Sequence, residues 1–292
     1  MSTSIRYDSP EAEAESIPMR SFVSIGVVAL LVVPGLAVAQ SDEIQVYDGG
    51  LAAAGILNLT VHNNFTPKGL TTPSFPGGIV ADKSFNGVPE FALGVTDWFE
   101  AGLYLPLYSR DKNTGWQVDG FKLRALFAIP HAGDRRFVYG VNFELSYNAR
   151  RWDPQRITSE IRPIIGWHFK PVDIIINPIF DTAYDGFENL EFVPAVRFAH
   201  NFSSGWAAAV EEYADLGPLH AFLPGAQQAH QLYGVVDHAG KTWEVELGVG
   251  VGLTRASDKL TVKLILARDL NKKEPARQSP AQPSSRQRRG SE

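Results

Sequence analysis

The 292-residue chain contains no cysteine. That absence excludes thiol catalysis, thiolate metal sites and disulfides, and it suits a chain that crosses an oxidising compartment without the risk of mispaired thiols. An excess of positive charge is missing as well, because the formal net charge is −5. Neutralising phosphates requires a basic surface, so we predict no nucleic-acid partner.

Recognisable catalytic motifs are also absent. The sequence has no GxSxG, HExxH, phosphate-binding loop or dinucleotide fingerprint. The turn Ser203-Ser204-Gly205 lacks the flanking glycines of a nucleophile elbow. Histidines that a hydrolase would need are scattered over separate segments, without a visible serine partner: His168, His200, His220, His230 and His238. We therefore predict no enzyme activity, catalytic residue, cofactor or metal site, and keep an outer-membrane lipid hydrolase as the second alternative.

Long apolar runs are limited to residues 22–38. This run ends in Ala37-Val38-Ala39, the small-x-small pattern that a signal peptidase accepts, and cleavage after Ala39 would leave Gln40 as the mature N-terminus. The segment before it is acidic where a basic one is expected, so we place the true translation start at Met19. A transmembrane anchor is the alternative, against which Pro34 and the short length argue.

The remaining sequence alternates with a period of two, and Gly, Pro, Asn and Asp gather in the gaps. In residues 241–254 the residues from Trp243 to Leu253 alternate between apolar side chains and glutamate or glycine. A mean hydropathy of −0.11 excludes a helical bundle in lipid, but a barrel strand shows only every second side chain to lipid. We predict an all-β fold, an antiparallel transmembrane β-barrel of about twelve strands near residues 54–64, 87–95, 98–108, 119–130, 137–147, 157–169, 172–183, 188–200, 205–214, 229–238, 241–253 and 259–270.

The gaps between these strands agree with a barrel of the outer membrane. Every second gap is short, as periplasmic turns are, and the longest gaps, 65–86 and 215–228, fall on the outer side. Aromatic residues stand near the predicted periplasmic turns, where a girdle meets the lipid headgroups: Trp98, Phe99, Trp167, Phe169, Trp206 and Trp243. A soluble β-sandwich or lipocalin-like barrel, whose strands also alternate, is the alternative architecture.

The predicted domain organisation has four parts. Residues 1–39 are a cleaved signal peptide, 40–53 a periplasmic N-terminal segment, 54–270 the outer-membrane barrel and 271–292 a disordered basic tail. The last strand lacks the terminal aromatic residue with which such barrels usually end. The expected partners are outer-membrane lipid, the barrel-assembly machinery and small-molecule solutes.

Polar side chains on the inner face are the candidate site. Charges in a lumen are tolerated when they are hydrated or paired across strands, so these residues either fill the interior or line an aqueous path. The candidates for lining the lumen are Lys122, Arg124, Asn142, Glu144, Glu160, Arg162, Asn177, Asp181, Glu191, Arg197, Glu244, Glu246 and Lys263.

One hairpin carries a resemblance to a known family. The stretch Asn86-Gly87-Val88-Pro89-Glu90-Phe91-Ala92-Leu93-Gly94-Val95-Thr96-Asp97-Trp98-Phe99-Glu100-Ala101-Gly102-Leu103 has a strand ending in Gly-Val-Thr-Asp and an aromatic-plus-acidic step into the next strand. It resembles outer-membrane transporters of the "MetA-pathway of phenol degradation" family, which implies uptake of small solutes, aromatic compounds among them. We expect a Gram-negative outer-membrane channel that works by passive diffusion, with a closed structural or surface-interaction barrel as the alternative.

Overall fold

A computed structural model of the protein describes residues 43–202 and 205–271. The predicted signal peptide, the start at Met19 and the tail after residue 271 lie outside the described residues, as do Ser203 and Ser204. Within the described ranges, no helix is long and apolar enough to cross a membrane. The helical segments there are two short 3-10 turns, η1 (Ala132–Asp134) and η2 (Phe187–Asn189).

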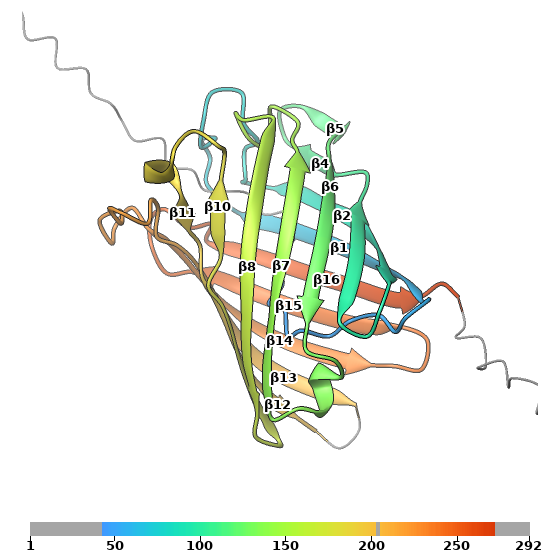
Figure 1. Ribbon diagram of the computed structural model, residues 1–292. Coiled ribbons are helices and arrows are strands. Elements are labelled where there is room, and N and C mark those ends of the chain that lie inside the picture. Colours follow the sequence, from blue (N-terminus) through green and yellow to red (C-terminus); the bar gives the residue numbers. More distant parts are fainter. Residues whose placement is uncertain (1–42, 203–204, 272–292) are drawn as a thin grey trace, which may run out of the picture. The chain divides into compact units, whose positions relative to one another are not determined.

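Antiparallel strands make up nearly all of the fold (Figure 1). In chain order they are β1 (Leu57–Lys68), β2 (Ser84–Gly94), β3 (Phe99–Tyr104), β4 (Tyr108–Asp111), β5 (Gly115–Val118), β6 (Phe121–Ala128), β7 (Phe137–Tyr147), β8 (Ile157–His168), β9 (Val172–Asn177), β10 (Phe180–Thr182), β11 (Glu191–Phe192), β12 (Ala195–Asn201), β13 (Trp206–Asp215), β14 (Ala229–Ala239), β15 (Glu244–Gly252) and β16 (Leu260–Asp269).

The sheet closes on itself as a barrel. Successive strands pair with one another, and β1 pairs with both β2 and β16, which joins the two ends of the sheet. Four of the barrel's strands are each interrupted once, so that β3 with β4, β5 with β6, β9 with β10, and β11 with β12 are halves of one strand. The barrel therefore has twelve strands, and the predicted fold class is confirmed.

The alternation seen in the sequence sorts side chains between the two faces of the wall. In β15, Leu247, Val249 and Val251 are about half exposed on the outer face, whereas Gly248 and Gly250 are buried on the inner face. Such a belt of exposed apolar side chains is the reverse of a soluble barrel, which buries them. The soluble alternative is thereby excluded.

The two ends of the barrel differ as predicted. One end has the connections 95–98, 129–136, 169–171, 202–205 and 240–243, and the other has the long loops 69–83 and 216–228. The gap predicted at 65–86 is longer at both ends than the observed loop 69–83. Phe65 and Phe85, which the prediction places in the gap, pair in the ladder that joins β1 to β2. The expected gap between residues 108 and 119 is instead occupied by the hairpin β4–β5, which extends the wall on the long-loop side.

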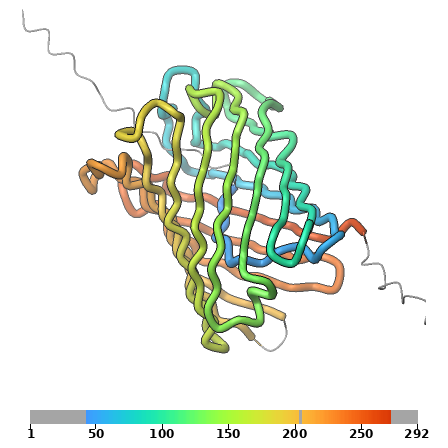
Figure 2. Tube along the Cα trace, viewed as in Figure 1, coloured from blue at the N-terminus to red at the C-terminus, as the bar shows by residue number. Residues whose placement is uncertain are grey.

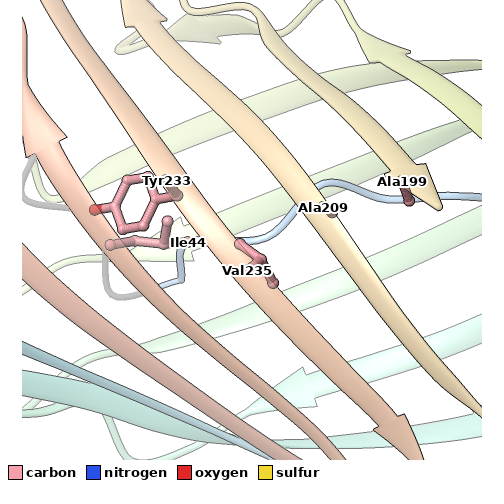
Figure 3. Close-up of a cluster of buried hydrophobic side chains, with 5 residues drawn as sticks. All are labelled: Ile44, Ala199, Ala209, Tyr233 and Val235. Atoms are coloured by element: carbon pink, nitrogen blue, oxygen red, sulfur yellow. The ribbon is translucent and has the colours of Figure 1, made fainter.

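Residues 43–53, called the N-terminal strap below, run inside the barrel before the chain enters β1 (Figure 2). The described part of the segment 40–53, predicted to be periplasmic, thus lies within the barrel wall. Ile44 packs in a cluster with Ala199, Ala209, Tyr233 and Val235 from β12, β13 and β14 (Figure 3). The strap thus supplies apolar surface against which part of the inner wall is buried.

Candidate functional site

Most of the predicted inward-facing residues are withdrawn from solvent. Arg124, Asn142, Glu144, Arg162, Asn177 and Lys263 are buried. Lys122, Glu160, Asp181, Glu191, Arg197 and Glu246 are half-buried, and Glu244 is exposed at the start of β15. The structure gathers many of these side chains into three ionic clusters, each with partners from neighbouring strands.

The first cluster surrounds Arg124 of β6. Its Nη2 lies 2.7 Å from Glu90 Oε1 and also bonds Glu100, while Glu90 Oε2 lies 3.2 Å from Nε2 of His62. Gly102 stands opposite Arg124 in the ladder between β3 and β6. A Cβ at Gly102 would come within 2.7 Å of Arg124 Nε, so the missing side chain makes room for the guanidinium.

The second cluster surrounds Arg162 of β8. Its Nε and Nη2 donate to the two oxygens of Glu160 at 2.7 and 3.0 Å, a bidentate pair that fixes the plane of the guanidinium. On β7 and β6, Asn142 donates to Glu144 at 2.9 Å and Lys122 Nζ lies 3.7 Å from Glu144. Basic and acidic side chains of β6, β7 and β8 thus gather in one group, in which Glu144 stands directly opposite Glu160 in the ladder.

The third cluster joins Lys263 of β16 to Arg197 of β12. Lys263 Nζ lies 2.5 Å from an oxygen of Glu211 and 2.5 Å from one of Glu246. Arg197 bonds Glu211 as well, and it also bonds Asp237. Taking a charge out of water is costly unless it is paired and hydrogen-bonded, which accounts for the interlocked arrangement.

Four carboxylates of these clusters were not among the predicted residues: Glu90, Glu100, Glu211 and Asp237. Each lies within a predicted strand and at the inner position of its alternation, so the sequence pattern did contain the signal. The strap's contribution has no such signal, because its residues follow no strand period.

Two of the inward cations hold the main chain of the strap. Lys263 Nζ donates to the carbonyl oxygen of Ile44 at 3.1 Å, and Arg162 Nη1 donates to that of Gln45 at 3.0 Å. These strands lie on different parts of the barrel wall, so the strap is held from two sides. The same cations therefore pair with carboxylates and anchor a segment in the lumen.

Tyr47 of the strap contacts several strands of the wall. Asn177 of β9 accepts a hydrogen bond from its N–H at 2.7 Å and donates to its carbonyl at 2.9 Å, which imitates a strand pairing. The Tyr47 hydroxyl lies 2.6 Å from that of Tyr104, and the Arg162 guanidinium lies 4.4 Å from the centre of the Tyr47 ring. The ring is thus held by a hydroxyl from β3 and a cation from β8, two strands that β6 and β7 separate.

The strap divides the lumen at the short-turn end of the barrel. One cavity of about 560 Å³ lies between the strap and strands β1, β2, β3, β6, β12, β14, β15 and β16. Another, of about 360 Å³, lies toward β8, β9, β12, β13 and β14. Asp48, Arg197, Asp237 and Ala239 border both cavities, so polar groups separate the two spaces.

The described residues give little support to hydrolytic or metal chemistry. The Ser257 hydroxyl donates to the main-chain carbonyl of His230 and accepts from its N–H, whereas the His230 ring faces Glu212 at 3.0 Å. His168 pairs with Asp173 at 2.6 Å. Within the ranges that the structure describes, no group of three or more histidine, aspartate and glutamate side chains could hold a metal ion.

Comparison with known proteins finds similar folds but no similar sequences. No protein-family model matches the chain, and no curated protein matches it. A crystal structure of an outer membrane channel from Pseudomonas putida F1 superposes with a TM-score of 0.52 at 12% identity, over 78% of this chain and 100% of that chain. The KdgM porin in complex with disordered oligogalacturonate (TM-score 0.48, 8% identity, 73% of this chain and 99% of that chain) is less similar. So is the NanC porin (0.47, 8%, 74% and 99%).

These findings define the class of fold. The chain is a twelve-stranded transmembrane β-barrel, similar in fold to a solved outer-membrane channel, whose lumen contains ionic clusters and its own N-terminal strap. At 12% identity the likeness concerns the fold, and the family resemblance of the hairpin 86–103 is not confirmed by a family model.

Proposed function

We propose that this protein is an outer-membrane channel through which small solutes diffuse passively, along the polar spaces beside the strap. The observation that carries the proposal is the pair of cavities, about 560 and 360 Å³, bordered by inward-facing charged side chains at one end of the barrel. Water and small polar solutes gain hydrogen bonds from such a lining, and a narrow charged lumen selects among them by size and charge.

Conductance is the direct test of a channel. The mature chain reconstituted in planar bilayers should give discrete current steps, and a bilayer that stays tight at all voltages would refute the proposal. Lys263→Met, which removes a hydrogen bond to the strap, should raise the step size. Lys241→Met, which removes an equal charge from the turn at 240–243, should leave the step size unchanged.

A closed barrel with a structural or surface-interaction role is the second candidate. The observation that favours it is the filling of the lumen by the strap and the three ionic clusters. A closed barrel would give no current steps in the unmodified chain, and steps would appear only after strap contacts are removed. The two candidates therefore predict opposite results for the unmodified chain.

Small aromatic compounds are the solutes that we propose as one class of cargo. The support is the resemblance of the hairpin 86–103 to transporters of small solutes, aromatic compounds among them. Phenol added to a conducting bilayer should reduce the mean current more than cyclohexanol at the same concentration, because a channel adapted to aromatic solutes retains the aromatic compound longer. Equal effects of the two compounds would remove the aromatic part of the proposal.

Export and assembly belong to the same proposal. We propose that residues 1–39 are a signal peptide, that the assembly machinery inserts the barrel into the outer membrane, and that 271–292 is a solvated tail. N-terminal sequencing of protein from isolated outer membranes should begin at Gln40. A retained N-terminus, or recovery in the inner membrane, would contradict this route.

A further inference from the structure

Three prolines lie side by side across three adjacent strands of the wall. Pro163 is in β8, Pro178 falls between β9 and β10, and Pro194 falls between β11 and β12. The strand formed by β9 and β10 keeps one register with β8 on both sides of its interruption, because Ile176 pairs with Ile165 and Phe180 pairs with Ile161. It also keeps one register with the strand formed by β11 and β12, because Asn177 pairs with Ala195 and Phe180 pairs with Phe192. These registers place Pro178 opposite Pro163 and Pro194 opposite Pro178.

The first two prolines face each other at a position that requires two hydrogen bonds. Across β8 and β9, the Phe169 N–H donates to the carbonyl of Val172 at 2.8 Å. In an antiparallel pair such hydrogen-bonded positions recur every second residue, and counting from Phe169 reaches Pro163 with Pro178. Proline has no N–H, so neither bond of this pair can form. The ladder is interrupted at that point, since β9 ends at Asn177 and β10 begins at Phe180.

The interruption is long for a barrel wall. The hydrogen-bonded positions that flank it are four residues apart, which at about 3.3 Å per residue leaves about 13 Å of strand edge without a ladder bond, twice the usual interval. The third proline, Pro194, weakens the pairing with β13. The Ala214 N–H donates to the Pro194 carbonyl at 3.0 Å, but Pro194 has no N–H with which to donate a second hydrogen bond to Ala214. Pro163 is about 20 Å of tilted strand from the turn at residues 169–171, near the middle of an apolar band about 25 Å tall.

The inner wall beside this interruption carries an apolar cluster, and the inward-facing side chains of Arg162 and Asn177 lie at its edge. Ile175, Ile179 and Ala195 form a buried cluster there, and Val46 of the strap packs on it. Outside, residues such as Ile161 are exposed on the lipid-facing side. An apolar surface inside, a row of missing donors and an apolar surface outside therefore follow one another through the wall.

We propose that the row Pro163, Pro178 and Pro194 is a lateral exit, through which small apolar solutes pass from the lumen into the membrane between β8 and the strand formed by β9 and β10. The proposal rests on the channel function and adds a route and a class of solute to it. The strap covers the inner mouth of the exit with Val46. Separation of the two strands there breaks no backbone hydrogen bond at the proline pair.

A reversible cross-link tests the exit. The chain has no cysteine, so Pro163→Cys with Pro178→Cys creates a single possible disulfide. Opposed hydrogen-bonded positions have Cα atoms about 5.5 Å apart, within the range that a disulfide spans. The matched control, Tyr139→Cys with Ile165→Cys, cross-links an opposed pair of β7 and β8 where the ladder is continuous. A second variant, Pro163→Val with Pro178→Val, restores both N–H donors without a cross-link.

Two measurements separate the exit from the channel. Entry of the apolar dye N-phenyl-1-naphthylamine into cells that carry the full chain reports the lateral route, and potassium chloride conductance in planar bilayers reports the axial one. We expect the oxidised proline-site disulfide to lower dye entry about tenfold, with recovery in dithiothreitol and unchanged conductance. The valine pair should also lower dye entry about tenfold, since two net hydrogen bonds stabilise the closed wall by about that factor.

Each contrary outcome has a distinct meaning. If the protein conducts and neither the proline-site disulfide nor the valine pair changes dye entry, the lateral exit is overturned and the channel function stands. An equal loss of dye entry in the control pair would overturn it too, because general stiffening of the barrel would then be the cause. Absence of conductance in the unmodified chain would refute the channel function itself.

Discussion

Lys263→Met removes an ammonium group whose side chain has no exposed surface and which lies 2.5 Å from both Glu211 and Glu246. Breaking a buried ion pair from one side costs about 3–5 kcal/mol, because the remaining carboxylate is left without its partner. Here Arg197 still contacts Glu211, so we expect the lower end, about 3 kcal/mol. The lost hydrogen bond to the Ile44 carbonyl is part of that cost.

The assay is reversible denaturant unfolding of the barrel in lipid vesicles, followed by tryptophan fluorescence. The second variant, Lys263→Met with Glu211→Gln, removes the carboxylate charge that the first leaves behind, and it should regain at least 1 kcal/mol, about one net hydrogen bond. An unfolding free energy of Lys263→Met within about 0.5 kcal/mol of the unmodified chain, the size of an ordinary surface substitution, would refute the reasoning. So would a double variant that is less stable than the single one.

Two further substitutions test other parts of the structure. Gly248→Val places a Cβ that would lie 2.7 Å from Lys263 Cε, so overpacking should cost about 1–3 kcal/mol in the same assay; Gly234→Val, which meets open space, should cost less than about 0.5 kcal/mol. Burial raises the pKa of Asp258, which accepts a hydrogen bond from the Leu70 N–H at 2.8 Å in the long-loop end. Because the pKa of this carboxyl is raised in the folded chain, its stabilising contribution is fully present below the unfolded pKa of 3.8 and is lost as the pH rises through the folded pKa. Asparagine does not titrate, so Asp258→Asn should gain stability relative to the unmodified chain between pH 3 and pH 7. Melting temperatures of the two proteins that change in parallel over this range would contradict that assignment.

The strand positions could be predicted from sequence because each is encoded locally. Alternation places Leu247 and Gly248 on opposite faces wherever the strand lies in the barrel. The same rule reaches Glu211 and Asp237, which were missed only because the inner positions of β13 and β14 were not followed. The ends of β1 and β2 were harder, since their extension depends on the pairing of Phe65 with Phe85 rather than on either sequence alone.

The strap could not be predicted, for a physical reason. Its position depends on hydrogen bonds between its main chain and side chains far away in sequence, such as Asn177 with Tyr47 and Lys263 with Ile44. A main-chain carbonyl gives no signal in the residue pattern, because every residue has one. The row of prolines also needed the register, since Pro163 and Pro178 become neighbours only when their strands are aligned.

The bond between Lys263 and Ile44 has a consequence for the order in which the molecule is made. Ile44 precedes the first strand and Lys263 stands in the last, so this contact joins the two ends of the barrel-forming chain. It can form only when β16 has been synthesised, delivered and paired with β1. Docking of the strap is therefore a late event of biogenesis, and the hydrogen bond between Lys263 and Ile44 is present only in a closed barrel. An intermediate that has not yet closed would leave the strap free and the Lys263 ammonium without its hydrogen bond to Ile44.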